Sequence, residues 1–149
     1  MKIIISPYSK QLRTGEPSPK DYPYWKELVS ILNKKHHIIQ IGVNGEPIIE
    51  GIHESKFNLS FKELEELTLS VDSFISVDNF YPHFCNTIGK YGYVIWGPSN
   101  PAIYGYAKNV NIIHTKPQFK VNQFGLWDKS DYNIHSFPSV NEVISRILI

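Results

Sequence analysis

Five short runs of apolar, mostly β-branched residues recur along the chain and constrain its fold more than any other feature. They occupy residues 2–5 (KIII), 37–42 (HIIQIG), 73–77 (SFISV), 91–96 (YGYVIW) and 110–114 (VNIIH). Each run is continuous rather than alternating, which is typical of strands buried on both faces. Segments with helical spacing separate the runs. The pattern predicts an α/β fold, a three-layer Rossmann-like arrangement around a mostly parallel sheet of about five or six strands.

Four segments between or after these runs have the apolar spacing of helices. They cover residues 22–35, 60–70, the end of 78–89, and 139–149. In the second segment Ser60 and Glu63 have the spacing of a capping box. Its expected inner face comprises Phe61, Leu64, Leu67 and Thr68. Helical segments between strands are the usual crossover connections of a parallel sheet.

Two segments have neither pattern. Residues 6–21 are rich in proline and hydroxyl residues, which predicts a long loop, and long loops in compact domains are often functional. Residues 116–138 are expected to be irregular, with a short strand near 132–135.

Length and composition fit one folded domain, 1–149, with 42% hydrophobic residues. The net charge of +1 gives no general attraction to nucleic acid or anionic membranes. The single cysteine, Cys85, excludes an internal disulfide and a cysteine-rich zinc site, and the histidines lack metal-ligand spacing, so we expect no metal. The apolar runs are too short for a signal peptide or a membrane span, which predicts a soluble, cytoplasmic protein.

Polar segments follow four of the predicted strands. They begin at Ser6, Gly42, Asp78 and Gly97. The carboxyl ends of parallel strands share one edge of a sheet, where ligands of such folds bind. The glycines form neither GxGxxG nor GxxxxGK[ST], so an ordinary nicotinamide or P-loop site is disfavoured.

Asp78 to His83 is the sharpest local feature. A helix that opens at Asn79 or just after it would offer free backbone N–H groups to a phosphate, and His83 could add a donor. The alternative is that Asp78 only caps this helix and His83 packs at its side.

Other candidates lie in the first two loops. Lys10 and Arg13 could reach a diphosphate, or they could be solvated loop residues. Glu46 could accept ribose hydroxyls, or it could belong to a surface turn. Cys85 is expected to be a packed small side chain rather than a nucleophile.

The order of these motifs resembles the carboxyl-terminal half of family 9 glycosyltransferases, the heptosyltransferase-like group. The resemblance covers about residues 2–114 and rests on five segments. They are Ile5-Ser6-Pro7 with Tyr22-Pro23-Tyr24-Trp25, Gly42 to Glu46, Ser60-Phe61-Lys62-Glu63-Leu64, Asp78 with His83, and Gly97-Pro98-Ser99-Asn100-Pro101.

The resemblance implies the nucleotide-sugar-binding half of a GT-B fold. Asp78, His83 and the helix after them would hold the donor diphosphate, and these two residues are the candidates for catalysis. Glu46 would hold the ribose, and a basic residue of the first loop would assist the leaving group. The remaining expected donor-site residues are Ser6, Lys10, Arg13, Gly42, Asn79, Gly97, Pro98 and Ser99. No metal or other cofactor is implied besides the donor.

The sequence departs from the family in two ways. Asn79-Phe80 stand where the family has Ser/Thr-Gly, and Phe80 would narrow the approach to a phosphate. The family's amino-terminal half, which binds the acceptor, has no counterpart. We therefore expect a homo-oligomer or a partner chain that covers exposed aromatic residues. Those expected to be hidden in this way are Tyr8, Tyr22, Tyr81 and Tyr104.

The leading hypothesis is a minimal glycosyltransferase that transfers a sugar from a nucleotide diphosphate to a hydroxyl acceptor. One form of it is a small viral enzyme that modifies a DNA base, although the near-neutral charge disfavours a DNA acceptor. The alternative is a non-catalytic nucleotide-binding or sequestering module, or a regulatory subunit of a two-chain transferase.

Overall fold

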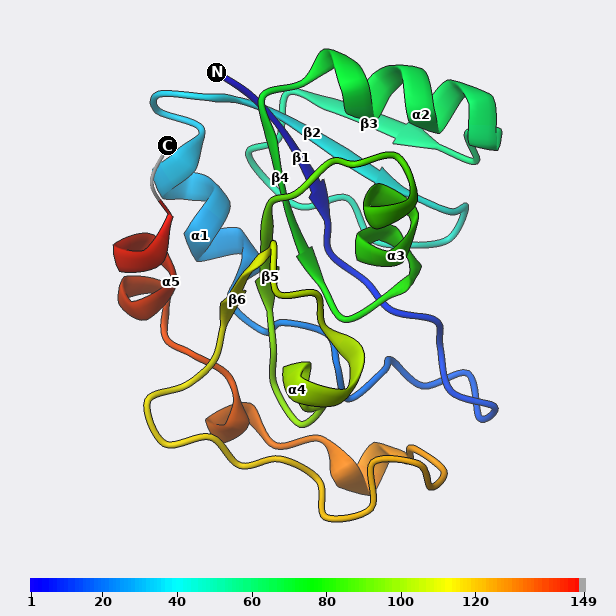
Figure 1. Ribbon diagram of the computed structural model, residues 1–149, viewed down its shortest axis with the longest axis vertical. Helices are drawn as coiled ribbons and strands as arrows, with labels where there is room; N and C mark the ends of the chain where they lie inside the picture. Colours follow the sequence, from blue (N-terminus) through cyan, green and yellow to red (C-terminus); the bar gives the residue numbers. More distant parts are fainter. Residues whose placement is uncertain (148–149) are drawn as a thin grey trace.

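The computed structural model describes residues 1–147 and has a six-stranded, all-parallel sheet (Figure 1). Its strands are β1 (Lys2–Ser6), β2 (His37–Gly42), β3 (Glu54–Phe57), β4 (Ser73–Val77), β5 (Tyr93–Ile95) and β6 (Val110–Ile112). The order across the sheet is β3-β2-β1-β4-β5-β6. The predicted α/β class and the parallel pairing of the five apolar runs are confirmed.

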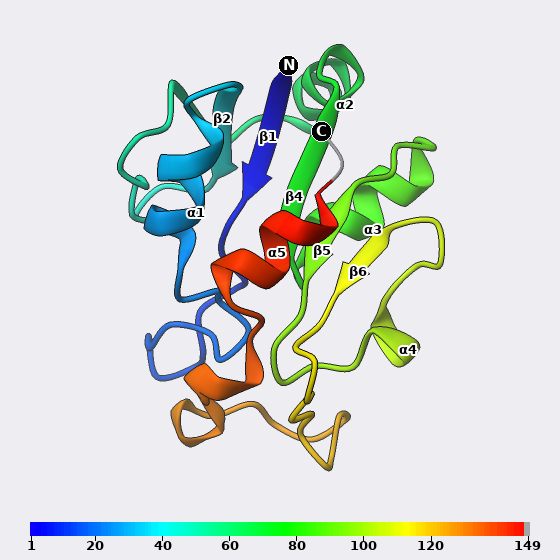
Figure 2. The same cartoon turned by 90° about the vertical axis from the view of Figure 1, so that its left-hand side faces the viewer.

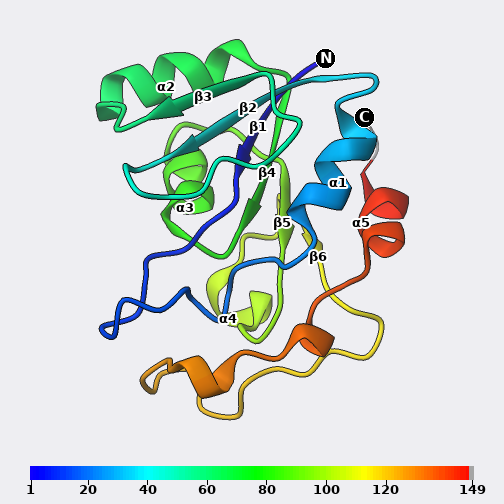
Figure 3. The same cartoon turned by 180° about the vertical axis from the view of Figure 1, so that it is seen from behind.

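Helices cover both faces of the sheet. One face carries α1 (Trp25–Leu32) and α5 (Val140–Arg146), which stand in front of the strands in Figure 2. The other carries α2 (Phe61–Ser70) and α3 (Phe80–Thr87), with the short α4 (Pro101–Tyr104) below them (Figures 1 and 3). The layers are therefore helix, sheet and helix.

The isoleucines of β1 show how the two faces are built. Successive side chains of a strand point to opposite faces. Ile3 and Ile5 pack in the cluster that contains α1 and α5, whereas Ile4 packs with residues of α2 and α3. All three are fully buried, which explains why the run has no polar alternation.

The caps of α2 and α3 follow from local side-chain chemistry. At α2, Glu63 N–H donates to Ser60 Oγ at 3.1 Å and Ser60 N–H donates to Glu63 Oε1 at 3.2 Å, which confirms the capping box. At α3, Asn79 is the N-cap, and its Oδ1 accepts from Tyr81 N–H at 2.9 Å.

Several expected details were wrong. Strand β3 was not among the expected strands, because its sequence (ESKF) contains no apolar run. It pairs at the edge of the sheet and is mostly exposed. The expected strand near 132–135 is absent, because 3₁₀ turns occupy Lys129–Asp131 and Ile134–Ser136. Phe61 does not belong to the inner face of α2, since it is 73% exposed. The carboxyl-terminal helix ends at Arg146, and its expected last residues, 148–149, lie outside the described residues.

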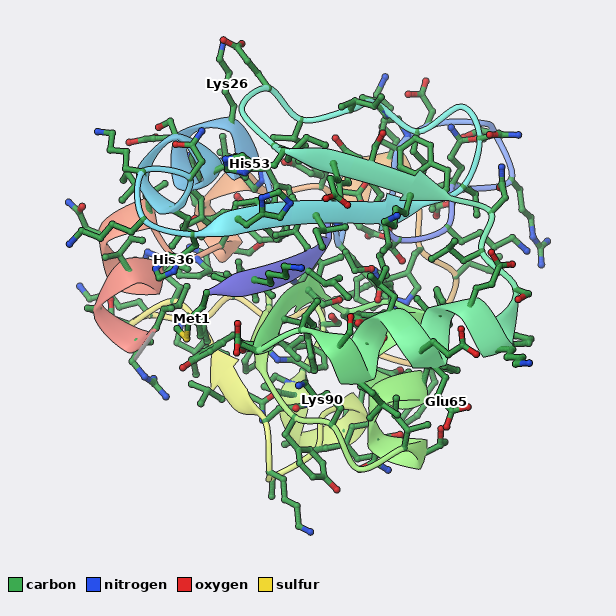
Figure 4. All side chains as sticks on the ribbon, turned by 90° about the horizontal axis from the view of Figure 1, so that it is seen from above. Met1, Lys26, His36, His53, Glu65 and Lys90 are labelled. Atoms are coloured by element: carbon green, nitrogen blue, oxygen red, sulfur yellow. The ribbon has the colours of Figure 1, made fainter. Side chains whose placement is uncertain are left out.

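The amino ends of the strands form the edge opposite to the polar loops. Figure 4 looks onto this edge, with Met1 and His36 near the starts of β1 and β2. Here Asp72 Oδ2 accepts from Lys2 N–H at 2.7 Å. Within residues 1–147, no three His, Cys, Asp or Glu side chains gather as metal ligands, and no helix is long and apolar enough to cross a membrane.

Candidate functional site

Strands β1 and β4 are neighbours at the centre of the sheet, and the chain extends outward from them in opposite directions. This reversal creates a crevice beyond their carboxyl ends, which is the usual ligand position in open parallel sheets. Ser6 ends β1 on one side of the crevice, and Asn79 follows β4 on the other.

Asn79 ties the two sides of this crevice together. Its Nδ2 donates to Ser6 Oγ at 2.9 Å and to the Tyr8 carbonyl at 3.0 Å. Its Oδ1 accepts from Ser76 Oγ at 3.1 Å as well as from Tyr81 N–H. The polar atoms of Asn79 are therefore committed to the protein, so this residue positions Ser6 and the first loop.

A pocket of about 720 Å³ opens beside the crevice, beyond the ends of β1 and β2. It takes residues from the first loop, the β2–β3 turn, the approach to α2, and the start of α3. Five sequence-predicted residues line it: Ser6, Lys10, Gly42, Glu46 and Asn79. Its volume is within the range of small-molecule sites.

Glu46 is held at the mouth of this pocket by its own turn. Its Oε1 accepts from Val43 N–H at 2.6 Å, and it occupies the space that a Cβ at Gly42 would need. Glycine at position 42 is thus required for this placement. The other carboxylate oxygen accepts no hydrogen bond from residues 1–147, which leaves it available to a ligand hydroxyl.

Two lysines and an apolar wall complete the pocket. Lys10 is exposed and has no ion-pair partner in the described chain, and Lys56 enters from β3. Ile41, Leu64 and Phe80 contribute apolar surface to the lining. The pocket therefore offers cations, a hydroxyl and a carboxylate together with a surface that suits a flat apolar group.

The start of α3 has fewer free donors than the sequence suggested. Asn79 already accepts from Tyr81 N–H, and Pro82, the third residue of the helix, has no N–H. Phe80 is 55% exposed and borders the pocket where the resembled family has glycine. The first turn can thus contribute the Phe80 N–H rather than a full cradle.

Asp78 does not line the pocket. It is buried, and its Oδ2 lies 3.0 Å from Lys20 Nζ, so the two residues form an ion pair. Lys20 also lies over the rings of Tyr104 and Trp127, 5.5 and 5.0 Å from their centroids. Asp78 is therefore covered by Lys20, which in turn contacts Trp127 of the 116–138 segment.

The Gly97-Pro98-Ser99 loop is filled in the same way. The ring of Phe137 packs where a Cβ at Gly97 would stand. Gln123 Nε2 donates to the Pro98 carbonyl at 2.9 Å, and Gln123 Oε1 accepts from Asn100 N–H at 3.0 Å. Ser99 is fully buried, with no partner for its Oγ within residues 1–147. The carboxyl-terminal segment thus occupies this part of the edge.

His83 and Arg13 also lie outside the pocket wall. His83 Nδ1 is 2.7 Å from Tyr106 Oη, on the exposed side of α3. Arg13 is exposed at the far part of the first loop. The structure consequently brings together five of the eleven predicted site residues and places the other six elsewhere on this edge or its surroundings.

Three ionisable groups next to the pocket influence one another. Burial raises the pKa of Asp21 to about 7, and the nearby Glu46 carboxylate adds to the increase, whereas hydrogen bonds from the Ser9 and Ser18 backbone oppose it. Burial also raises the pKa of Glu46. The pKa of Tyr8 is raised by burial and then by these two carboxylates.

The sequence did not single out Tyr8, Asp21, Lys20 or Lys56 as neighbours of a site. Only the fold brings Lys56 from the edge strand and Lys20 from the loop to the sheet edge. The expectation that four tyrosines are exposed was wrong for Tyr22 and Tyr81, which are buried core residues. Cys85 is fully buried, as predicted, and burial raises the pKa of its thiol to about 12.

The comparisons with known proteins add no assignment to this geometry. No family model matches the chain, and neither a search of curated proteins nor one of solved structures finds a match. The class of the protein therefore rests on its fold and its pocket.

Proposed function

We propose that the pocket binds the nucleoside diphosphate part of a nucleotide sugar. One observation carries this proposal: lysines, a hydroxyl, a carboxylate and an apolar wall meet in one cavity beside the β1–β4 crevice. Each of these groups matches a different part of such a ligand. The resemblance to family 9 glycosyltransferases points to the same edge of the sheet.

The parts of the ligand are assigned by their chemistry. A nucleobase would pack on the wall formed by Ile41, Leu64 and Phe80. The free oxygen of Glu46 would accept ribose hydroxyls. Lys10 and the Ser6 hydroxyl would lie along the diphosphate, where charge-assisted hydrogen bonds are strongest.

Transfer of the sugar to a hydroxyl acceptor is the enzymatic form of the proposal. Lys10 and the start of α3 would stabilise the departing diphosphate without a metal, largely by position and charge. The acceptor site and its base would come from a second copy or a partner chain.

A binding or regulatory module is the second candidate. It is favoured by the contacts of the two residues considered for catalysis, since Asp78 is paired with Lys20 and His83 with Tyr106. Neither residue faces the pocket. The two candidates share the binding step and differ in turnover.

A thermal-shift panel of UDP-, GDP-, ADP- and dTDP-sugars tests the proposal. A ligand at ~100 times its dissociation constant adds about 2.7 kcal/mol to the free energy of unfolding. Lys10→Ala should weaken binding about tenfold, since it removes a charge-assisted contact. Lys35→Ala, an exposed lysine at the opposite edge, should leave it unchanged.

No shift with any member of the panel would overturn the proposal. If a nucleotide sugar binds, release of free nucleoside diphosphate in the presence of hydroxyl acceptors distinguishes the enzyme from the binding module.

A further inference from the structure

We propose that Asp21 is a positioning residue of the pocket, and that its carboxyl group takes up a proton when a diphosphate enters. This inference deepens the proposed function and rests on it for the identity of the ligand. It concerns a residue that neither the motifs nor the pocket wall single out.

The positioning role follows from how the first loop is held. Asp21 Oδ1 accepts from Ser9 N–H at 2.7 Å, across twelve residues of chain. Tyr8, Ser9, Lys10, Gln11 and Leu12 all line the pocket. Two further side-chain bonds hold the start of this loop, from Trp25 Nε1 to the Pro7 carbonyl at 3.1 Å and from Asn79 Nδ2 to the Tyr8 carbonyl at 3.0 Å, but both stop before Ser9. Asp21 therefore fixes the wall that carries Lys10.

The surroundings of Asp21 explain why its carboxyl group would bind a proton near neutral pH. It is more than half buried, and the groups that act on it or respond to it are Glu46, Tyr8 and Tyr132, all acids. The adjacent Lys20 directs its ammonium to Asp78 instead. Burial, and after it the Glu46 carboxylate, raises the pKa of the Asp21 carboxyl to about 7, and no cation among residues 1–147 pairs with Asp21 to offset them.

A diphosphate in the pocket would bring two further negative charges toward the Asp21 carboxyl group. Like charges favour the protonated carboxyl and raise its pKa again. The occupied pocket therefore holds more protons than the empty one near neutral pH. By linkage, affinity must fall as pH rises through the pKa of the empty state.

The sharpest probe is a nucleotide sugar, because both of its phosphates are diesters and do not themselves titrate near neutral pH. Calorimetric titration with UDP-glucose, GDP-mannose and ADP-glucose at pH 7.5, in two buffers of different ionisation enthalpy, counts the protons taken up. We expect uptake of about half a proton and an affinity about fivefold weaker at pH 8 than at pH 6.

Two variants separate the loop contact from the titration. Asp21→Asn keeps an oxygen for Ser9 N–H but cannot ionise, so binding should become nearly independent of pH. Asp21→Ala loses both, so its binding should also be nearly independent of pH, and about tenfold weaker than that of Asp21→Asn because the loop loosens. Asp72→Asn is the matched control, because Asp72 makes the same kind of contact to Lys2 N–H at the opposite edge.

Proton uptake that persists in Asp21→Asn, or an Asp21→Ala variant that binds like the wild type, would overturn the proposal. If no nucleotide sugar binds the wild type, the proposed function fails separately. Amide hydrogen exchange then decides the positioning role without ligand: faster exchange at residues 8–12 in Asp21→Ala supports it, and unchanged exchange overturns it.

Discussion

The two halves of the carboxyl edge of the sheet share the same order of strand and polar turn but differ in how the space beyond the strands is used. Beyond β1 and β2, a strand is followed by a polar turn and the space between the turns stays open. Beyond β4 and β5, polar turns also follow the strands, but Lys20, Gln123 and Phe137 fill the space. Both halves contain glycine, serine and a carboxylate, so residue types alone do not tell them apart.

The difference shows what turns a polar loop into a site. Glu46 and Asp78 both follow buried strands, yet Glu46 keeps a free oxygen at a cavity whereas Asp78 faces a lysine. The lysine and the aromatic rings that complete the Asp78 contact come from distant segments. A pocket remains only where no such segment covers the edge.

Breaking the ion pair of the filled half should have the largest effect on stability. Lys20→Met leaves the buried Asp78 carboxylate without its cation, which we expect to cost about 3 kcal/mol in the free energy of unfolding. Urea denaturation measures this change. Asp78→Asn added to Lys20→Met should recover part of the loss, and an additive double variant would contradict the pairing.

The same substitution in each half gives the next contrast. Gly97→Ala drives a methyl group into the buried Phe137 ring and should cost about 2 kcal/mol. Gly42→Ala meets the end of the Glu46 side chain, which can swing away, and should cost about 0.5 kcal/mol while it weakens nucleotide-sugar binding. Equal costs in urea denaturation would mean that the two halves are packed alike.

The pH dependence of stability sharpens the description of the open half. The raised pKa of Asp21 means that the folded protein retains a proton that the unfolded chain releases near pH 4. Stability from this group is present at low pH and is lost as pH rises from about 4 to 7. Asp21→Asn should gain stability relative to the wild type over that window, by about 1 kcal/mol because the group is partly solvated. A constant difference across pH would contradict the raised pKa.

The smallest effect is expected at His83. If His83 donated to the diphosphate, His83→Ala would weaken donor binding ten- to a hundredfold. Because the ring contacts Tyr106 outside the pocket wall, we now expect affinity within about twofold of the wild type and a stability change under about 0.5 kcal/mol. A tenfold loss of affinity in calorimetric titration would show that His83 contributes to the binding site.

The fold was predictable because its signal is local. Continuous apolar runs such as HIIQIG, and caps such as Ser60 with Glu63, determine the strands, the helices and the parallel class. The edge strand β3 escaped prediction because it is half solvated and carries no apolar run.

The site was predictable only in part. Ser6 and Gly42 end β1 and β2, and Glu46 lies in the turn after β2, so their position follows from topology. Asp78 and Gly97 are covered by Lys20 and Phe137, respectively. These covering residues lie 58 and 40 positions away in the sequence and belong to no motif. Long-range side-chain packing of this kind cannot be read from spacing.

The central claim is that the open half of the edge, and not the filled half, takes the ligand. Amide chemical-shift mapping with the nucleotide sugar that gives the largest thermal shift tests it directly. The account predicts shifts at residues 6–12, 42–46 and 79–80, with 97–99 and 127 unaffected. Shifts centred on Asp78, Gly97 and Trp127, with residues 42–46 unchanged, would contradict it.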